Sequence, residues 1–198
     1  QLTSAFNRVY QQINNSRAQI TQEVNAASNK INQLTTQISD MNRKISYSEV
    51  GGEQANDLRD KRDLLIDQLS EYGKVNFVES SQGMYNVTFE GVTLVAGALS
   101  SDIEANDFTN SMGERQLQIQ FKESEQSFVV TSGRMGSMLK HYNEYLPEQM
   151  NKLNTLAETI STEVNKIHAA SYGLPQGTPP AASTGINFFS GIDAGTIK

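Results

Sequence analysis

Apolar residues recur at steps of three or four along the first 45 residues of the chain. Between them lie Gln, Asn, Ser, Thr, Lys and Arg, and no Pro or Gly interrupts residues 1–50. This spacing predicts an amphipathic helix whose apolar stripe repeats about every 3.5 residues, as in coiled coils. A stripe of this length needs partner helices beside it, because a small compact core cannot bury it. The stripe comprises Leu2, Phe6, Val9, Ile13, Ser16, Ile20, Val24, Ala27, Ile31, Leu34, Ile38, Met41 and Ile45.

A glycine pair ends this helix, and a second helical pattern follows. Gly51 and Gly52 supply turn conformations that other residues adopt only with strain. Helical spacing resumes from Gln54 to Tyr72, and Gly73 ends it. We expect this second helix to fold back against the end of the first. One face of it carries Leu58, Leu65, Leu69 and Tyr72.

The middle of the chain changes to a period of two. Alternation of apolar and polar residues predicts an antiparallel sheet that is covered on one face and wet on the other. We place a hairpin turn at Glu90 and Gly91, and a loop over the polar stretch from Ser100 to Glu114. The predicted strands are Val75–Glu79, Tyr85–Phe89, Val92–Val95, Gln116–Phe121 and Ser127–Thr131.

Helical spacing returns after Gly133 and forms a second apolar stripe. Pro147 lies inside this stripe, and we predict a kink or short break there, because an interior proline removes a helical hydrogen bond. Gly, Pro, Ser, Thr and Ala dominate the stretch from Gly173 to Gly185, which predicts a loop before the apolar anchor at Phe188 and Phe189. The stripe comprises Leu139, Tyr142, Leu146, Met150, Leu153, Ala157, Ile160, Val164 and Ile167.

These patterns predict a mainly α fold with a small antiparallel β part, namely a long coiled-coil-like helical bundle with an inserted β-subdomain. We assign residues 1–73 and 133–172 to the bundle, 74–132 to the β-subdomain, and 173–198 to a loop and the start of a following segment. The helices are expected to pack along one seam. Its residues are Ile20, Val24, Ile31, Leu34, Ile38, Met41, Ile45, Leu146, Met150, Leu153, Ile160 and Val164.

The composition agrees with long solvated helices. Hydrophobic residues make up 37% of the 198 residues, below the roughly 45–50% of globular proteins. Disorder would also lower this fraction, but the strong apolar patterning argues against it. The net charge of -6 disfavours nucleic acid and membrane surfaces as partners, because both carry negative charge. Cysteine is absent, which excludes disulfides and thiolate metal sites.

Signatures of catalysis or cofactor binding are missing from the sequence. His141 and His168 are the two histidines, and neither lies in a zinc-binding H-E-x-x-H motif. The chain also lacks the nucleophile elbow, the phosphate-binding glycine loops and the EF-hand spacing. We therefore expect no catalytic residue, no metal and no cofactor.

Two segments of the sequence can each be interpreted either as a functional site or as ordinary helix structure. The charged run from Asp57 to Asp63 contains carboxylates that would suit acid–base chemistry, yet Asp and Arg three or four apart on a helix ordinarily form surface pairs. The glycines around Arg134 precede a helix whose N-terminus would suit an anion, although small residues commonly begin helices. We favour the structural reading of both.

Several motifs, in collinear order, resemble the family of the first flagellar hook-associated protein. The segment from Leu58 to Leu69 matches its L-x-D-x-R-D-x-L-x-x-x-L helix, and Ile31 to Ile38 matches its I-x-x-L-x-x-x-I segment. The stretch from Tyr85 to Gly97 resembles its small sheet. The motif residues that we single out are Leu58, Arg59, Asp60, Arg62, Asp63, Leu65, Leu69, Asn165, His168, Phe188 and Phe189.

This resemblance implies a structural protein of the bacterial flagellum that joins hook to filament. It further implies secretion through the flagellar export apparatus and a place outside the cell. The implied partners are the hook protein, the second junction protein, copies of the chain itself in an assembled ring, and an export chaperone for the full-length protein. We expect the chain to be the folded outer part of a longer protein.

Two other readings stay open at this point. A helical-rod binding module on a cell surface or secretion tip, such as an adhesin, would explain the helices and the sheet equally well. It would require an upstream Sec signal, whereas the junction role requires none. A hydrolase inserted in a flagellar chain would require a metal or triad signature, which the sequence lacks.

Overall fold

A computed structural model describes residues 1–52, 54–171, 185, 187–191 and 193–198. The chain divides into two compact units, which are described separately. The terminal unit comprises Gln1–Ala18 and Glu144–Lys198, and the central unit comprises Gln19–Asn143. These units are defined by contacts between residues, whereas the predicted domains separate the helical bundle from the β-subdomain. The predicted domain bounds therefore stay a prediction.

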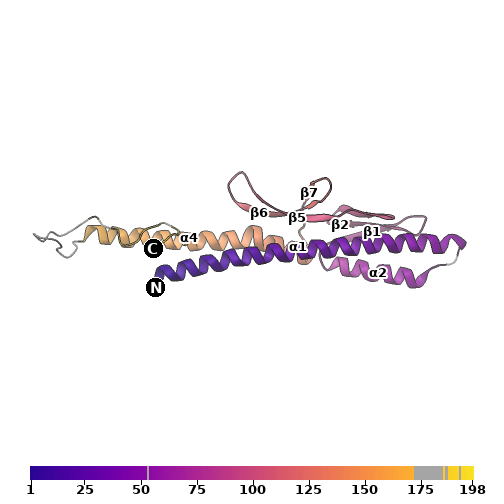
Figure 1. The fold of residues 1–198 in the computed structure, drawn as a ribbon, viewed down its shortest axis with the longest axis horizontal. Coiled ribbons are helices and arrows are strands. Elements are labelled where there is room, and N and C mark those ends of the chain that lie inside the picture. The colour runs from indigo at the N-terminus through magenta and orange to yellow at the C-terminus, as the bar shows by residue number, and fades with distance from the viewer. Residues whose placement is uncertain (53, 172–184, 186, 192) are drawn as a thin grey trace, which may run out of the picture. The chain divides into compact units, whose positions relative to one another are not determined.

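The predicted helices and strands all occur, in the predicted order, and two further strands lie between them. Helix α1 spans Leu2–Ser48, the 3-10 turn η1 spans Glu49–Gly51 and α2 spans Asn56–Ser70. Within the central unit, α2 runs beside the last part of α1, and the strands lie along one side of α1 (Figure 1). The mainly α fold with an antiparallel β part is therefore confirmed.

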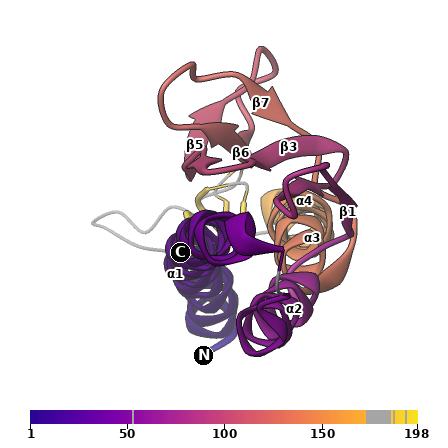
Figure 2. The same cartoon turned by 90° about the vertical axis from the view of Figure 1, so that its right-hand side faces the viewer.

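Two antiparallel sheets replace the single sheet that we expected. The first has the order β1-β2-β3-β4 and the second the order β5-β6-β7; an end-on view separates them (Figure 2). The strands are β1 Val75–Glu79, β2 Tyr85–Phe89, β3 Val92–Ala96, β4 Leu99–Ser100, β5 Ile103–Thr109, β6 Arg115–Phe121 and β7 Ser127–Phe128.

The loop predicted from Ser100 to Glu114 is wrong for Ile103–Thr109, because this middle part forms strand β5. Its polar residues find partners on β6 rather than in solvent. Asn106 donates to the Gln120 side chain at 2.9 Å, and Gln120 donates to Glu104 at 2.9 Å. Cross-strand amide and carboxylate pairs of this kind stabilise a strand whose composition resembles that of a loop.

A β-bulge lets two neighbouring apolar residues of β3 point inward. Val87 pairs with Val95 but Thr88 pairs with Thr93, so Leu94 is the extra residue. Both Leu94 and Val95 are buried. A regular strand would expose one of them, because side chains alternate between its two faces.

Chain segments far apart in sequence meet where α2 ends and α3 (Gly133–Lys140) begins. The backbone N–H groups of Arg134 and Met135 donate to the carbonyls of Glu71 and Tyr72, at 3.0 Å each. These bonds satisfy amides and carbonyls that helix ends ordinarily leave unpaired. The strands therefore leave and rejoin the helical layer at one point.

We predicted a kink or short break at Pro147; the chain instead stays helical there, and the α-helical hydrogen-bond pattern changes in a π-helical turn just before it. A π-helical turn η2, His141–Tyr145, follows α3, and helix α4 spans Leu146–Ala170. Pro147 occupies the first turn of α4, where its missing N–H removes no helical hydrogen bond. The loop predicted from Gly173 to Gly185 lies outside the described residues, except for Gly185 itself.

Candidate functional site

Arg62 lies at the centre of a buried polar cluster in the central unit. Its side chain is 0% exposed. Its Nη1 donates to the Asn42 Oδ1 at 2.9 Å and to the Gly83 carbonyl at 2.6 Å. Its guanidinium carbon lies 3.3 Å from the centre of the Tyr85 ring. This cluster ties α1, α2 and the first sheet together.

The charge of Arg62 is costly at this position. Burial lowers the pKa of its guanidinium, and the neighbouring Tyr85 offsets part of that effect. A desolvated guanidinium is stabilised by stacking on an aromatic ring and by hydrogen bonds to fixed acceptors. The contacts thus place Arg62 in the packing of the unit, whereas we had expected surface pairs along Asp57–Asp63.

Arg59 joins three separated parts of the central unit. It donates to both Glu49 carboxylate oxygens at 2.8 Å each, and to Glu79 at 2.6 Å. Hydrogen bonds from Arg59 and from the Ala55 N–H lower the pKa of Glu49 to about 2. The arrangement closes the turn between α1 and α2 and fixes the end of β1 against α2.

Four asparagines on the helical segments each hold one residue outside the helices by two hydrogen bonds. In each pair the amide oxygen accepts from a backbone N–H, and the amide nitrogen donates to the carbonyl of the same residue. All eight distances lie between 2.8 and 3.0 Å. We call these pairs asparagine clamps: Asn32 to Ile103, Asn42 to Tyr85, Asn143 to Leu117, and Asn165 to Phe189.

The clamps imitate a strand neighbour. An antiparallel partner residue exchanges the same two hydrogen bonds with the residue opposite it. Asn32 thus covers part of the free edge of β5, and Asn143 does the same for β6. Edge strands left bare invite pairing with other chains.

The terminal unit has its own apolar core. Phe6 of α1, Ala157 of α4, and Phe189, Ala194 and Ile197 of the last segment are buried together. Tyr10, Leu153, Ile160 and Val164 pack against them. The last segment is therefore bound to both helices, and Asn165 fixes its backbone at Phe189.

The seam residues that we predicted differ in burial. On α1, Ile20, Val24, Ile31, Leu34, Ile38 and Ile45 are buried, and Met41 is half-buried because its neighbour Asn42 takes the inward position. On α4, Leu146 is buried and Met150, Leu153, Ile160 and Val164 are half-buried.

The motif residues lie in two groups. On α2, Arg62 and Leu69 are buried, Leu58, Arg59 and Leu65 are half-buried, and Asp60 and Asp63 are exposed. In the terminal unit, Asn165 contacts Phe189, and the His168 ring lies 5.7 Å from that of Phe188. The structure thus brings together members of the second group that lie 20 or more residues apart in sequence.

Sequence reasoning missed the clamps of Asn32, Asn42 and Asn143. Asn42 had a recognisable signal, because it lies four residues after Ile38 and three before Ile45. A polar residue at a position suited to the apolar stripe marks a buried hydrogen-bonding partner. Asn32 and Asn143 carried no such signal, because each follows directly after a stripe residue, Ile31 or Tyr142, and so lies off the apolar stripe.

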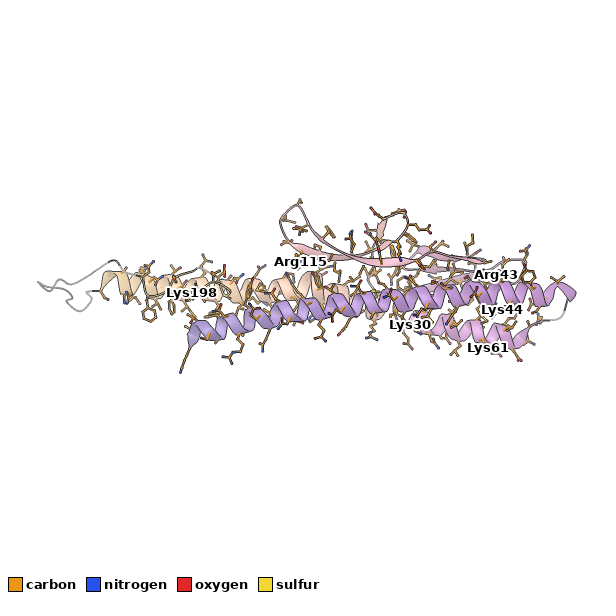
Figure 3. All side chains as sticks on the ribbon, in the orientation of Figure 1. Lys30, Arg43, Lys44, Lys61, Arg115 and Lys198 are labelled. Atoms are coloured by element: carbon orange, nitrogen blue, oxygen red, sulfur yellow. The ribbon has the colours of Figure 1, made fainter. Side chains whose placement is uncertain are left out.

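The described residues offer little for chemistry. No three His, Asp or Glu side chains among them gather closely enough to bind a metal ion. No helix in the described part of the chain is both long and apolar enough to cross a bilayer. In the central unit, the labelled basic side chains come from different elements: Lys30, Arg43 and Lys44 from α1, Lys61 from α2 and Arg115 from β6 (Figure 3).

Comparison with known proteins supports the resemblance in the motifs. Residues 1–189 match the family model described as the flagellar hook-associated protein FlgK helical domain. The chain is 27% identical over 182 residues to flagellar hook-associated protein 1 of Salmonella typhimurium, with 86% of this chain and 32% of the relative covered. It is 24% identical over 180 residues to the protein of that name from Escherichia coli K12, with the same coverage.

A solved structure shares the fold. The flagellar hook junction protein FlgK from Burkholderia pseudomallei superposes with a TM-score of 0.76 at 24% identity, covering 92% of this chain and 34% of that one. The chain thus spans about a third of the length of the curated relatives that it matches. Because the family model covers nearly the whole chain, this chain belongs to the flagellar hook-associated protein FlgK helical domain family.

Proposed function

We propose that this chain is the folded helical part of a protein that joins the flagellar hook to the filament. The observation that carries the proposal is the family match over residues 1–189. The relatives' names, flagellar hook-associated protein 1 and hook junction protein, point to a structural role. We infer that the chain acts by rigid packing and is not an enzyme.

Rigidity would come from the contacts described above. In the central unit, the Arg62 cluster and the Arg59 ion pairs fix α2 and the first sheet against α1. In the terminal unit, the Asn165 clamp fixes the last segment to α4. A junction between two rigid assemblies needs subunits that keep their shape, and buried polar contacts with defined partners favour one packing over others.

Exposed apolar residues of the terminal unit are the proposed contact surface. Leu156 and Ile167 of α4 are 52% and 68% exposed. Their spacing of eleven residues is about three helical turns, so they lie on one line of the helix. Leu2 and Val9 of α1 are also exposed. Exposed apolar side chains on the outside of a helix are the kind of surface that a neighbouring molecule covers in an assembly.

We propose that this surface meets other axial proteins in the assembled flagellum. The expected neighbours are copies of this chain, the hook protein and the second junction protein. An export chaperone would bind the full-length protein before secretion. The proposed location is outside the cell, on the flagellum.

Deletion of the gene tests the junction role directly. We expect cells that make hooks without attached filaments, visible by electron microscopy, and that regain filaments when the full-length gene is restored. Normal filaments in the deletion strain would contradict the proposal. They would also reopen the alternative of an adhesin-like rod, which no observation above favours.

A double substitution tests the contact surface within the full-length protein. Leu156→Glu with Ile167→Glu places two charges on the proposed line and is expected to abolish filament attachment without unfolding the protein. Thr162→Glu, an exposed change on the same helix, is the matched control and should leave attachment normal. Normal attachment with the double variant would exclude this surface.

A further inference from the structure

Strand β7 stops earlier than its sequence favours. The run Ser127-Phe128-Val129-Val130-Thr131 predicts a strand over all five residues, because Val, Phe and Thr favour strands. The structure contains only Ser127–Phe128 as β7. Val129 is then left 76% exposed, whereas Val130 is buried.

The backbone groups of β6 with which a longer β7 would pair already form hydrogen bonds with another residue. Ile119 pairs with Phe128, and Gln120 with Ser127. Continuing this register would pair Val129 with Gln118 and Val130 with Leu117. The Leu117 N–H and carbonyl, however, are both bound by Asn143 at 2.8 Å. Val130 and Asn143 would use the same two backbone groups, so they exclude each other.

The surroundings leave room for Val130 to replace Asn143 as the partner of Leu117. A cavity of about 240 Å³ lies between the β6 edge and this segment, lined among others by Leu117, Val129, Val130, Leu139 and Asn143. Beyond it, the Thr131 side chain donates to the Glu90 carboxylate at 3.3 Å, which anchors the end of the segment. The movable part is therefore short and fixed at both ends.

We propose that residues 129–130 form a strap that closes onto β6 when Asn143 releases Leu117. In the open state, Asn143 occupies the edge of β6. In the closed state, β7 extends through Val130 and occupies it. Because Asn143 belongs to the π-helical turn η2, closure couples the edge of the second sheet to the geometry of that turn. This inference does not depend on the junction role.

Amide hydrogen exchange of the Asn143→Ala variant tests the strap. The variant removes the competitor, so the Val130 amide should exchange at least about tenfold more slowly than in the unmodified protein. The Leu117 amide should stay protected, because Val130 replaces Asn143 as its partner. Loss of protection at Leu117 without a gain at Val130 would overturn the proposal.

Asn32→Ala is the matched control. Asn32 clamps Ile103 in the same way, at 2.8 and 2.9 Å, but among the described residues no strand borders that edge of β5. We expect faster exchange at Ile103 and no change at Val130. Slower exchange at Val130 in this control would show that the response is not specific to the β6 edge.

Disulfide trapping provides a measurement that does not need Asn143 to be replaced. The chain has no cysteine of its own. Cysteines at positions 118 and 129, in the variant Gln118→Cys with Val129→Cys, face each other only in the closed state. The variant Gln120→Cys with Ser127→Cys spans an existing pair and should cross-link readily.

The rate of trapping decides the outcome. We expect the 118–129 pair to cross-link more slowly than the 120–127 pair, and to become faster when Asn143→Ala is added. Absence of the 118–129 cross-link in both backgrounds would refute the strap. A rate that Asn143→Ala leaves unchanged would show that the segment moves without competing for Leu117, which also contradicts the proposal.

Discussion

The side chain of Asn165 forms hydrogen bonds with both the backbone N–H and the backbone carbonyl of Phe189. Its amide oxygen accepts from the Phe189 N–H at 2.8 Å, and its amide nitrogen donates to the Phe189 carbonyl at 2.9 Å. The two residues are 24 positions apart, and most of the chain between Ala170 and Phe189 lies outside the described residues. One side chain thus fixes the backbone of the last segment at Phe189 against α4.

Replacing Asn165 should loosen that segment. Asn165→Leu removes both hydrogen bonds and leaves partly buried backbone groups unpaired, which costs about 1–3 kcal/mol. We expect faster exchange of the Phe189 amide and earlier proteolysis after residue 185, measured by mass spectrometry. Lys166→Leu, an exposed neighbour, is the control. Equal behaviour of the two variants would show that the clamp contributes little.

Arg62 is expected to matter for stability rather than for surface charge. Arg62→Met keeps the length of the side chain but removes the donor to Asn42 and Gly83. The Asn42 oxygen then keeps only the Tyr85 N–H and the Gly83 carbonyl loses its Arg62 donor, so we expect a loss of about 1–3 kcal/mol in the free energy of unfolding. Urea denaturation measures it.

Lys61→Met is the control for Arg62→Met. Lys61 is exposed on the same turn of α2, and exposed changes of this kind usually alter stability by less than about 0.5 kcal/mol. If the two variants unfolded at the same urea concentration, the buried cluster would not be a source of stability.

The ion pair between Glu49 and Arg59 should make the free energy of unfolding depend on pH. Hydrogen bonding to Arg59 lowers its pKa from 4.5 to about 2 in the folded protein. A carboxyl group with a depressed folded pKa stabilises fully above its unfolded pKa, and this contribution is lost as the pH falls toward the folded value. The contribution of Glu49 should therefore decline between about pH 5 and pH 2.

Urea denaturation of the protein and of Glu49→Gln across this range checks the pH dependence. The unmodified protein should be the more stable at pH 7, and the difference should shrink as the pH falls. Glu114→Gln, an exposed carboxylate on the β5–β6 turn, serves as the control. A difference that stays constant with pH would rule out the ion pair as its origin.

Gly133 is predicted to tolerate no side chain. Its φ of 62° lies in the left-handed region, and a Cβ atom there would lie 2.5 Å from the Tyr72 carbonyl carbon. Gly133→Ala should destabilise by about 3 kcal/mol or more, because strain and a backbone clash add together. Thermal unfolding followed by circular dichroism measures the change.

Gly113→Ala separates strain from the clash at Gly133. Gly113 also has a positive φ, 80°, but a Cβ atom added to it would have no neighbouring atom within 4 Å. The substitution should cost only about 1–2 kcal/mol, the cost of left-handed backbone alone. Equal losses at the two positions would show that the close approach of α2 to α3 is easily relieved.

Sequence patterns that repeat along the chain predicted the elements well. The stripe from Leu2 to Ile45 defined α1, and period-two alternation located β2, β3 and β6. Such patterns succeed because each element must bury one face, and the period of the apolar residues follows from its geometry. The polar strand β5 escaped notice, because its stabilising partners on β6 are not its neighbours in sequence.

The candidate site divides in the same way. Arg62, Asn165 and Phe189 were singled out by motif, but no pattern indicated that Arg62 is buried or that Asn165 binds Phe189. The end of β7 at Phe128 was also unpredictable, since Asn143, 15 positions later in the chain, takes the hydrogen bonds that Val130 would need.

By itself, then, the sequence determined the fold class, the order of the helices and apolar strands, and the family resemblance, because all three are expressed in local spacing. The tertiary structure alone decided whose backbone the buried polar side chains hold. A hydrogen bond between distant residues leaves no periodic trace, since its two partners need only meet in space.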